Sequence, residues 1–448
     1  MTVKVRFAPS PTGRIHVGNV RTALMNVLFA RKHTGTVLLR IDDTDLERST
    51  PEYEQGIKDD LTWLGLHWEE SFKQSDRFDR YEAAKQALID TGLLYPCYES
   101  EDELDRKRKI QRAQGKPPVY DRAALALTED EKRTLEAEGR RPHWRFKLSG
   151  GRIAWRDLVR GDSHIETSSV SDPILIRADG SYLYTLPSVV DDIESNVTHI
   201  IRGEDHVTNS AAQIEIFEAV GGKGSAPAMG HFPLLVGPDG EKLSKRLGSL
   251  AIADLREIEG YEPLAVLSLL AKIGTSDPVE IRTAIDQLVD DFDLDKISRT
   301  PARFDPAELE RLNAKLLHAL EYADLKDRLA VLDADGGEAF WHAVRPNLTR
   351  LKDVAEWRRL VNGPVEPVIE DADYAAEAAA LLPADPLGPD SWSQWTNAIK
   401  DKTGRKGKQL FMPLRLALTG QARGPEMAEL LPLIGAETAK RRLAGETA

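Results

Sequence analysis

The first 41 residues constrain the fold more than any other segment, because they show the patterns of a strand, a helix and a second strand in turn. Residues 3–7 alternate apolar and polar side chains, and a run rich in proline and glycine follows at 9–13. Apolar residues then recur at helical spacing until Gly35, and residues 36–41 have the composition of a buried strand. Two strands that flank one helix predict parallel pairing, so we expect an α/β fold that begins at the amino-terminal end.

The segments that follow indicate a mixed α/β insertion. Capping-box patterns at residues 100–103 and 128–131 predict two helix starts. Residues 144–148 then alternate apolar and basic side chains, and a hairpin turn is predicted at 179–180. We expect this insertion to occupy residues 85–187.

The opening sheet is predicted to be completed after the insertion. Three later segments have strand composition, namely residues 189–190, 197–201 and 232–236. Because they follow the insertion in sequence, we expect one α/β domain built from two pieces, residues 1–84 and 188–248.

The second half of the chain is predicted to be helical. Strand patterns fade beyond Leu250, and the leucines between 309 and 320 fall on one helical face. Residues 383–389 are rich in proline and are a candidate linker. We expect a helical domain over 249–312 and a helical region over 313–448, which divides into 313–382 and 383–448.

Charge and cysteine content exclude several classes of protein. The net charge of −13 argues against nucleic-acid binding by bulk positive charge, although it is compatible with a local basic face. The one cysteine, Cys97, excludes a disulfide framework and a metal site built from thiolates alone, and we expect a small buried hydrophobe there. The sequence shows neither a membrane-spanning run nor a secretory leader, so we expect a cytoplasmic protein without a membrane partner.

The first candidate site is the run from Pro9 to Asn19, between the predicted strand and helix. Ligands of open α/β folds bind at this edge of the sheet, where the amide groups of a helix start attract anions. Glycines allow a phosphate to approach the backbone, and His16 could donate to a phosphoryl oxygen. The lysine and hydroxyl residue of a P-loop are missing after Gly18, which disfavours an ordinary P-loop NTPase. A turn with a capping histidine explains the run about equally well.

The second candidate site is the basic run from Lys242 to Arg246, which follows a Gly-Pro-Asp-Gly turn. Cations on a loop of this kind can neutralise charge on a transferring or leaving phosphate. Taken alone, a solvated basic loop is the better explanation. Further basic runs at 106–116 and 402–408 are candidate phosphate contacts, and a solvated helix face explains the first about equally well.

A third set consists of charged residues that we expect at strand ends. It comprises Arg6, residues 42–45, the pair Asp191 and Asp192, and residues 202–205. Arginine can clamp a carboxylate by paired hydrogen bonds while a nearby carboxylate holds an ammonium group, so the set describes a pocket for an α-amino acid. Alternatively, Asp42, Asp43 and Asp45 bind magnesium or cap a turn, and Arg202 forms a structural ion pair with Glu204.

Taken together, these motifs resemble those of the bacterial glutamyl-tRNA synthetases, which are class I aminoacyl-tRNA synthetases. The resemblance rests on residues 6–13, 16–19, 41–45, 189–192, 201–205 and 242–246. The helical remainder, including residues 404–426, is similar to the anticodon-binding part of that family. The match therefore covers nearly the whole chain, and the joint pattern is far more specific than any single motif.

The resemblance implies a fold and an activity. The fold would be a Rossmann-like catalytic domain with an acceptor-end insertion, followed by a helical stem-contact domain and an all-α anticodon-binding region. The activity would be ATP-dependent conversion of L-glutamate to glutamyl-adenylate, with Mg²⁺ accompanying ATP, and transfer of the glutamyl group to the 3′ end of tRNA(Glu), with tRNA(Gln) left open as a further or alternative acceptor. The family likeness also implies a monomer, and the lone Cys97 predicts that zinc is not bound.

The resemblance also implies which residues bind each substrate. The ATP contacts would be Pro9, Ser10, Thr12, Gly13, His16, Gly18, Asn19, Lys242, Leu243, Ser244, Lys245 and Arg246. Of these, His16, Lys242 and Lys245 would take part in catalysis. The glutamate pocket would be lined by Arg6, Ala8, Ser10, Asp42, Tyr184 and Arg202. Arg202 would pair with the side-chain carboxylate, and Asp42 would hold the α-amino group.

Three positions depart from the family's pattern. Asn19 replaces a second histidine, so one imidazole contact to ATP is absent. Asp42 stands where many members have glutamate, which resembles the glutaminyl branch, and Ser188 stands where many have asparagine. A glutaminyl-tRNA synthetase is disfavoured by the helical second half, because that branch carries β-barrels there. A truncated paralogue that modifies a base of aspartate tRNA would lack this half, and a non-catalytic tRNA-binding protein would not need the nucleotide motifs.

Overall fold

The computed structural model describes residues 2–243 and 250–448, and the chain forms two compact units. The first unit is Met1–Ile258 with Leu267–Pro306, and the second is Glu259–Val266 with Ala307–Ala448. All strands of the described residues lie in the first unit. An α/β part followed by an all-α half is therefore confirmed, whereas the finer domain boundaries at residues 84, 187, 248, 312 and 382 stay predictions.

The first unit opens with the parallel sheet that the sequence predicted. Its first elements are β1 (Lys4–Phe7), α1 (Val17–Lys32), β2 (Thr36–Ile41), α2 (Pro51–Trp63) and β3 (Glu70–Lys73). Strand β2 pairs in parallel with both β1 and β3, so β2 is the central strand of this group. It is buried along nearly its whole length, as expected for a strand that is covered on both faces.

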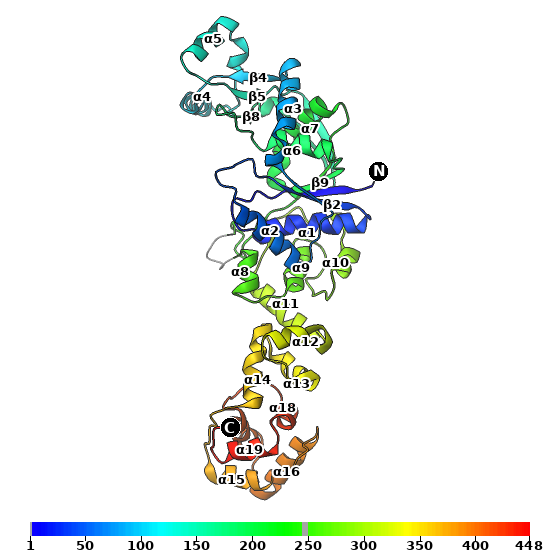
Figure 1. The fold of residues 1–448 in the computed structure, drawn as a ribbon, viewed down its shortest axis with the longest axis vertical. Coiled ribbons are helices and arrows are strands. Elements are labelled where there is room, and N and C mark those ends of the chain that lie inside the picture. The colour runs from blue at the N-terminus through cyan, green and yellow to red at the C-terminus, as the bar shows by residue number, and fades with distance from the viewer. Residues whose placement is uncertain (1, 244–249) are drawn as a thin grey trace. The chain divides into compact units, whose positions relative to one another are not determined.

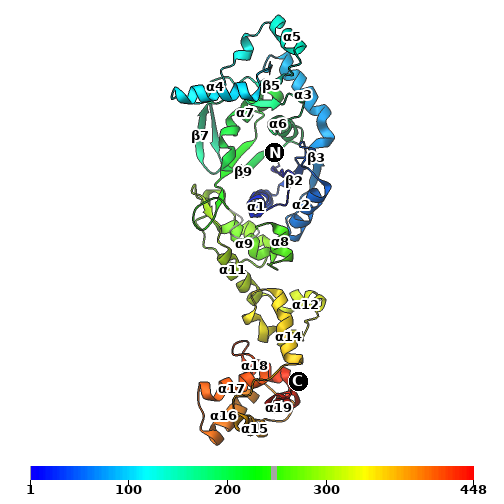
Figure 2. The ribbon, with the colours of Figure 1, turned by 90° about the vertical axis from the view of Figure 1, so that its left-hand side faces the viewer.

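Two later strands extend the same layer. They are β9 (His199–Gly203) and β10 (Ala228–Phe232), which pair in parallel and flank α7 (Val207–Gly221). The Thr198 N–H donates to the carbonyl of Lys4 over 2.9 Å, and Asn26 of α1 donates to the carbonyl of Ile201 over 2.9 Å. Strand β9 therefore lies beside β1, with α1 along the sheet (Figures 1 and 2). The carboxyl ends of β1, β2 and β9 consequently meet at one edge.

The insertion combines helices with antiparallel strands. Its elements are α3 (Phe78–Asp90), β4 (Leu94–Cys97), α4 (Glu101–Ala113), α5 (Glu129–Ala137), β5 (His143–Phe146), β6 (Arg152–Asp157), β7 (Gly161–Glu166) and β8 (Ile174–Ile176). Strand β5 pairs with β4 and β8, while β6 and β7 form a separate ribbon. Capping boxes at Ser100 and Thr128 begin α4 and α5, as predicted. The hairpin at 179–180 is also confirmed, because the Leu183 N–H donates to the Leu175 carbonyl over 2.9 Å.

Two strand predictions were wrong. Residues 189–190 lie in α6 (Thr185–Glu194), where Val189 and Val190 are buried. A short apolar run cannot be assigned to strand or buried helix by periodicity alone. The strand predicted over 232–236 is interrupted at Pro233, which has no N–H for a sheet. Beyond it, β11 (Leu235–Val236) pairs with β12 (Ala302–Arg303) instead of β10.

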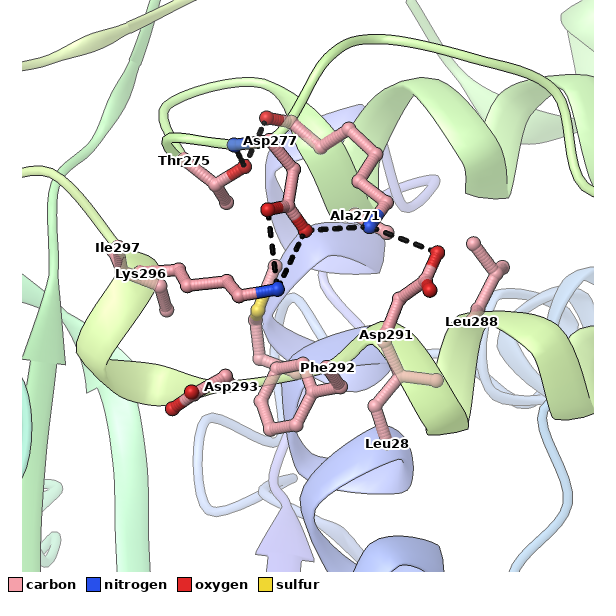
Figure 3. A pocket seen from close by; sticks show the side chains of 12 residues that line it. Leu28, Ala271, Thr275, Asp277, Leu288, Asp291, Phe292, Asp293, Lys296 and Ile297 are labelled. Carbon is pink, nitrogen blue, oxygen red and sulfur yellow. Dashed lines mark hydrogen bonds and ion pairs between the residues drawn. The ribbon is translucent and has the colours of Figure 1, made fainter.

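The helical end of the first unit contains α8 (Ile252–Glu257), the part of α9 (Pro263–Lys272) from Leu267 onward, and α10 (Ile285–Asp291). An ion-pair cluster lies among these residues. Lys272 Nζ lies 2.8 Å from Asp277 Oδ2 and 3.0 Å from Asp291 Oδ2, and Lys296 Nζ lies 3.1 Å from Asp277 Oδ1 (Figure 3). The cavity between these residues holds about 10 Å³, which suffices for about one water molecule. The cluster therefore joins loops and helices and has no room for an organic substrate.

The second unit consists of helices around one apolar core. In order they are α11 (Pro306–Ala319), α12 (Tyr322–Val331), α13 (Gly337–Val344), α14 (Val354–Asn362), α15 (Ala372–Ala380), α16 (Ser391–Thr403), α17 (Lys408–Thr419), α18 (Met427–Ile434) and α19 (Ala436–Leu443). Trp341 and Trp395 are fully buried in this core, together with leucines from most of the helices. None of the described helices is both long and apolar enough to cross a membrane.

Candidate active site

The start of α1 positions the first candidate motif. His16 is the N-cap residue, and its Nδ1 accepts a hydrogen bond from the Gly18 N–H over 3.1 Å. A second hydrogen bond joins the same turn, in which Asn19 Oδ1 accepts from the His16 backbone N–H over 3.1 Å. Asn19 therefore completes a capping box with the histidine, a role that we did not predict for it.

The cap determines the tautomer of His16. A ring nitrogen that accepts a hydrogen bond carries no proton, so the proton of the neutral imidazole is on Nε2. The surrounding protein lowers the pKa of His16 by removing water from its ring, which favours this neutral form. The turn explanation and the ligand explanation are thus compatible, because Nδ1 caps the helix while Nε2 is available to donate to an anion.

The breaker run lies at the edge formed by the carboxyl ends of β1 and β2. The Asp42 N–H donates to the Pro9 carbonyl over 3.0 Å, and Thr12 donates to the carbonyl of Ser10 over 2.9 Å. Pro9 is buried, while Ser10 and Thr12 are exposed. A Cβ added at Gly13 would meet no protein atom within 4 Å, so the protein's own packing does not require glycine there.

Described residues on both sides of the second motif form backbone bridges. Lys242 is exposed and forms an antiparallel bridge with Val236, and Leu243 follows it. After the motif, Ala251 forms a bridge with His16. Ala251 therefore lies at the cap of α1, five residues after the last residue of the basic run. The predictions for Ser244, Lys245 and Arg246 lie outside the described residues.

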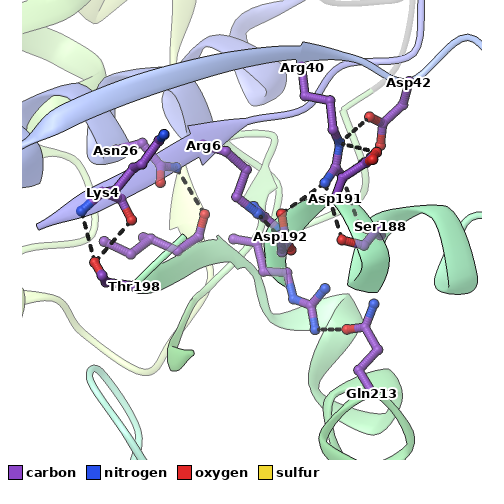
Figure 4. Close-up of polar contacts among 12 residues, drawn as sticks. Lys4, Arg6, Asn26, Arg40, Asp42, Ser188, Asp191, Asp192, Thr198 and Gln213 are labelled. Carbon is purple, nitrogen blue, oxygen red and sulfur yellow. Dashed lines mark hydrogen bonds and ion pairs between the residues drawn. The ribbon is translucent and has the colours of Figure 1, made fainter. Parts of the chain in front are cut away.

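A buried arginine that sequence reasoning missed organises the sheet edge. Arg40 of β2 is fully buried, and its Nε and Nη2 donate to both oxygens of Asp42 over 2.6 and 3.1 Å. Its Nη1 donates to Asp192 over 2.8 Å, and its Nη2 also donates to Ser188 Oγ over 2.8 Å (Figure 4). The available signal was an arginine inside an otherwise apolar predicted strand.

The aspartates of α6 complete this group from another element. Asp192 also lies 3.4 Å from Arg6 Nε, and Asp191 accepts from Arg77 over 2.7 Å and from Tyr81 over 2.9 Å. Both are buried on a helix, so the prediction that they end a strand was wrong. Ser188, on the same helix, uses its hydroxyl to accept from Arg40.

Arg202 of β9 differs from Arg40 in the charge of its partners. The residue is 4% exposed, and its guanidinium donates to Ser210 Oγ over 2.8 Å, Gln213 Oε1 over 2.5 Å and Tyr184 Oη over 3.2 Å. Its Nε donates to His231 Nε2 over 3.3 Å. Within the described part of the chain, no carboxylate oxygen lies within 4.0 Å of these nitrogens. A buried cation of this kind is expected to be paired, so Arg202 is suited to receive an anionic ligand.

The charges of the site act on two further predicted residues. Burial raises the pKa of Asp42 to about 6, although Arg40 and Arg6 oppose it, so Asp42 is mainly ionised at neutral pH. Burial would raise the pKa of Tyr184, but Arg202, Arg6 and Arg40 outweigh it and lower the pKa. The site therefore combines three buried arginines with the carboxylates of Asp42, Asp191 and Asp192, which lie beside Arg6 and Arg40.

Comparisons with known proteins agree with this geometry. A family model described as "tRNA synthetases class I (E and Q), catalytic domain" matches residues 2–311, and one described as "Anticodon binding domain" matches residues 311–445. The chain belongs to this class I tRNA synthetase family. Its resemblance to that family is thereby confirmed, as is the predicted anticodon-binding fold of the helical half.

Individual relatives of this synthetase match over their full lengths. "Glutamate--tRNA ligase 1" of Maricaulis maris is 68% identical over 99% of this chain and 100% of the relative. "Glutamate--tRNA ligase 2" of Hyphomonas neptunium is 60% identical over 98% and 99%. The crystal structure of a glutamate tRNA ligase from Elizabethkingia meningosepticum, in complex with its amino acid, has a TM-score of 0.85 at 28% identity over 99% and 98% of the two chains.

The synthetase fold brings together most of the residues predicted for glutamate. Arg6, Asp42, Tyr184 and Arg202 meet at the sheet edge, and Ala8 follows β1 there. Other acidic residues of the same motifs have structural partners, and these are Asp43 with Ser75, Asp45 with Arg48, and Glu204 with Arg160. The alternative in which Arg202 forms an ion pair with Glu204 is therefore wrong.

The insertion of this synthetase contains the single cysteine. Cys97 is buried, and its Sγ lies 3.6 Å from the Tyr120 hydroxyl. Burial raises the pKa of the thiol to about 11. In the parts of the chain that the structure describes, no group of three or more His, Cys, Asp and Glu side chains is arranged to hold a metal ion. The prediction that the insertion binds no zinc stays a prediction.

Proposed function

We propose that this chain is a glutamate–tRNA ligase, which activates L-glutamate with ATP and transfers it to the 3′ end of tRNA(Glu). The observation that carries the proposal is the buried guanidinium of Arg202, whose hydrogen-bond partners among the described residues are all neutral. The side-chain carboxylate of glutamate would supply the missing negative charge and accept a charge-assisted hydrogen bond from the Nη1 N–H that Tyr184 does not use. Glutamine has no such charge and would leave the guanidinium unpaired.

The remaining pocket residues are proposed to bind the amino-acid end of glutamate. Asp42 uses one lone pair on each oxygen for Arg40, and a carboxylate oxygen can accept a second hydrogen bond from an ammonium group. Arg6, Ala8 and Ser10 would line the same end of the pocket. The ammonium at Asp42 and the carboxylate at Arg202 would fix the glutamate at both ends, as positioning catalysis requires.

The first reaction step is attack by the α-carboxylate of glutamate on the α-phosphorus of ATP. A new P–O bond forms, the bond to pyrophosphate breaks, and glutamyl-adenylate remains. His16 Nε2–H would donate to a phosphate oxygen, and Lys242 and Lys245 would balance the charge of the leaving pyrophosphate. Mg²⁺ would enter with ATP as part of the substrate. The other residues of both motifs, from Pro9 to Asn19 and from Lys242 to Arg246, would contact the nucleotide.

The second step is attack by a terminal ribose hydroxyl of the tRNA on the adenylate's carbonyl carbon, with AMP as the leaving group. The match to an anticodon-binding model supports recognition of tRNA by the helical half. We propose that the enzyme acts as a monomer in the cytoplasm. Analytical ultracentrifugation of the pure protein tests this, because a monomer should give a mass of about 49.8 kDa.

The experiment that tests the function is attachment of labelled L-glutamate to purified tRNA(Glu) and tRNA(Gln), assayed side by side with ATP and Mg²⁺. Charging of tRNA(Glu) supports the proposal, and charging of tRNA(Gln) decides whether the enzyme distinguishes the two. Parallel reactions with L-glutamine test the competing glutaminyl activity. Failure of folded protein to charge either tRNA with glutamate would overturn the proposal.

A further inference from the structure

A buried network surrounds the guanidinium of Arg202 on the side away from Tyr184. His231 of β10 and Ser210 of α7 are fully buried, and Gln213 of α7 is 2% exposed. Gln213 points at the guanidinium, and its oxygen lies 2.5 Å from Arg202 Nη2 (Figure 4). Arginine has donors only, so the amide of Gln213 must present its oxygen to it.

The orientation of His231 is set by a carboxylate on another strand. Asp157, the last residue of β6, accepts from His231 Nδ1 over 2.5 Å and from the His231 backbone N–H over 3.1 Å. The same carboxylate accepts from the backbone N–H groups of Val159 and Arg160. These bonds lower the pKa of Asp157 to about 2 against the effect of burial, so it is ionised and fixes the imidazole proton on Nδ1.

His231 Nε2 is consequently the unprotonated nitrogen, and it faces Arg202 Nε at 3.3 Å and Ser210 Oγ at 2.8 Å. The order Asp157, His231, Ser210 has the bonding pattern of a catalytic triad, but all three side chains are buried and Ser210 also contacts the guanidinium. A substrate carbonyl cannot reach this serine. The network therefore acts on Arg202 and not as a nucleophile.

We infer that His231 and Gln213 are specificity-determining positioning residues, which hold Arg202 with neutral acceptors so that its charge is left for the side-chain carboxylate of the amino-acid substrate. The imidazole ring stands between Asp157 and Arg202, so Asp157 orients the histidine without pairing with the arginine. The inference rests on the proposed function, because it concerns the same glutamate pocket.

A change of charge at Gln213 tests the inference with almost no change of shape. Gln213→Glu places a carboxylate against Arg202, and Gln213→Met removes the hydrogen bond without adding charge. We expect Gln213→Glu to raise KM for glutamate on the order of 100-fold, to leave KM for ATP within about twofold, and to lower the preference for glutamate over glutamine. Gln213→Met is expected to raise KM for glutamate about tenfold or less.

The imidazole is tested by a conservative pair of variants. His231→Asn keeps a neutral polar side chain, whereas His231→Leu removes the side-chain hydrogen bonds of residue 231 to Arg202 and Asp157 and keeps its backbone bond to Asp157. We expect a raised KM for glutamate in His231→Leu and partial rescue in His231→Asn, measured by pyrophosphate exchange with tRNA(Glu) present. Thermal unfolding of each variant shows whether the protein is folded.

The outcomes separate this inference from the proposed function. If the wild-type enzyme charges tRNA with glutamate and Gln213→Glu keeps the wild-type KM and amino-acid preference, the inference is overturned while the function stands. Equal losses in Gln213→Glu and Gln213→Met, with KM for ATP changed as much as KM for glutamate, would also overturn it by revealing a purely structural role. If wild-type protein charges no tRNA, the proposed function fails first.

Discussion

Gly18 donates its backbone N–H to Nδ1 of His16, and a Cβ added at Gly18 would lie 2.9 Å from Cε1 of the same ring. Real Cβ atoms do not approach so closely, so glycine is required for the histidine to cap the helix with its ring in this position. The contact between His16 and Gly18 therefore caps α1 and keeps the imidazole proton on Nε2. That N–H is then available to a ligand.

Gly18→Ala is expected to displace the His16 ring without disrupting α1. Alanine is about 1 kcal/mol more favourable than glycine in a helix, which offsets the loss of the histidine cap, so stability should be nearly unchanged. The rate of glutamyl-adenylate formation should fall about 10- to 100-fold because the Nε2–H donor moves. Pyrophosphate exchange and thermal unfolding measure both effects. Gly56→Ala in α2 is the control, since an added Cβ there meets nothing within 4 Å and activity should stay normal.

Arg202→Ala is expected to raise KM for glutamate about 100-fold or more, because the carboxylate loses its charge-assisted bonds. KM for ATP should change far less. Arg80→Ala, at an arginine on α3 with a 58% exposed side chain, is expected to change neither value. Equal effects of Arg202→Ala on both substrates would count against the assignment of the side-chain pocket.

Lys245→Ala is expected to lower kcat by about 100- to 1,000-fold while the protein stays folded, because a cation that stabilises the transition state is lost. This prediction comes from the sequence, since Lys245 lies outside the described residues. Lys223→Ala, at an exposed lysine after α7, should leave kcat unchanged and serves as the control. Near-normal turnover of Lys245→Ala would remove it from the catalytic set.

Arg40→Met is expected to destabilise the first unit by about 3–5 kcal/mol, because Asp42 and Asp192 would remain buried without their cation. Differential scanning calorimetry should show a lower Tm. Arg48→Met is the matched control, since it breaks the exposed pair with Asp45 and is expected to leave the Tm nearly unchanged. A Tm for Arg40→Met equal to that of wild type would contradict the role of Arg40.

His143 gives a pH dependence of stability with a defined sign. Burial, helped by Arg145, lowers its pKa from 6.5 to about 4, so the unfolded chain binds its proton at a higher pH than the folded chain does. Its contribution to stability is therefore complete above pH 6.5 and falls by about 3 kcal/mol as the pH drops to 4. His143→Gln should abolish this share of the acid-induced loss. In NMR spectra, the His143 ring signal should not titrate between pH 8 and 5.5.

Local patterns predicted the elements whose causes are local. The opening strand–helix–strand unit, both capping boxes and the hairpin at 179–180 follow from periodicity and turn chemistry within a few residues. The strand prediction for residues 189–190 was wrong because an apolar pair in a buried helix resembles a buried strand in sequence. Only the packing of the folded chain decides between the two.

Motif comparison identified Arg202 and Asp42 but not the residues that hold them. Arg40, Asp157, Gln213 and His231 come from separate segments, and nothing in their own neighbourhoods in sequence marks them as partners. Their roles arise because a buried charge must find its compensating groups wherever the folded chain places them. Such pairings depend on distance in space and are absent from any local pattern.

The sequence by itself determined the family, the α/β start with its helical second half, and the two motifs suited to a nucleotide, because these depend on residue identity and short-range spacing. Only the tertiary structure decided that Arg40 is neutralised by aspartates while Arg202 is surrounded by neutral groups. The physical reason is that burial removes water from both arginines, so the charge each retains for a ligand is set by the side chains that the fold brings within about 3 Å.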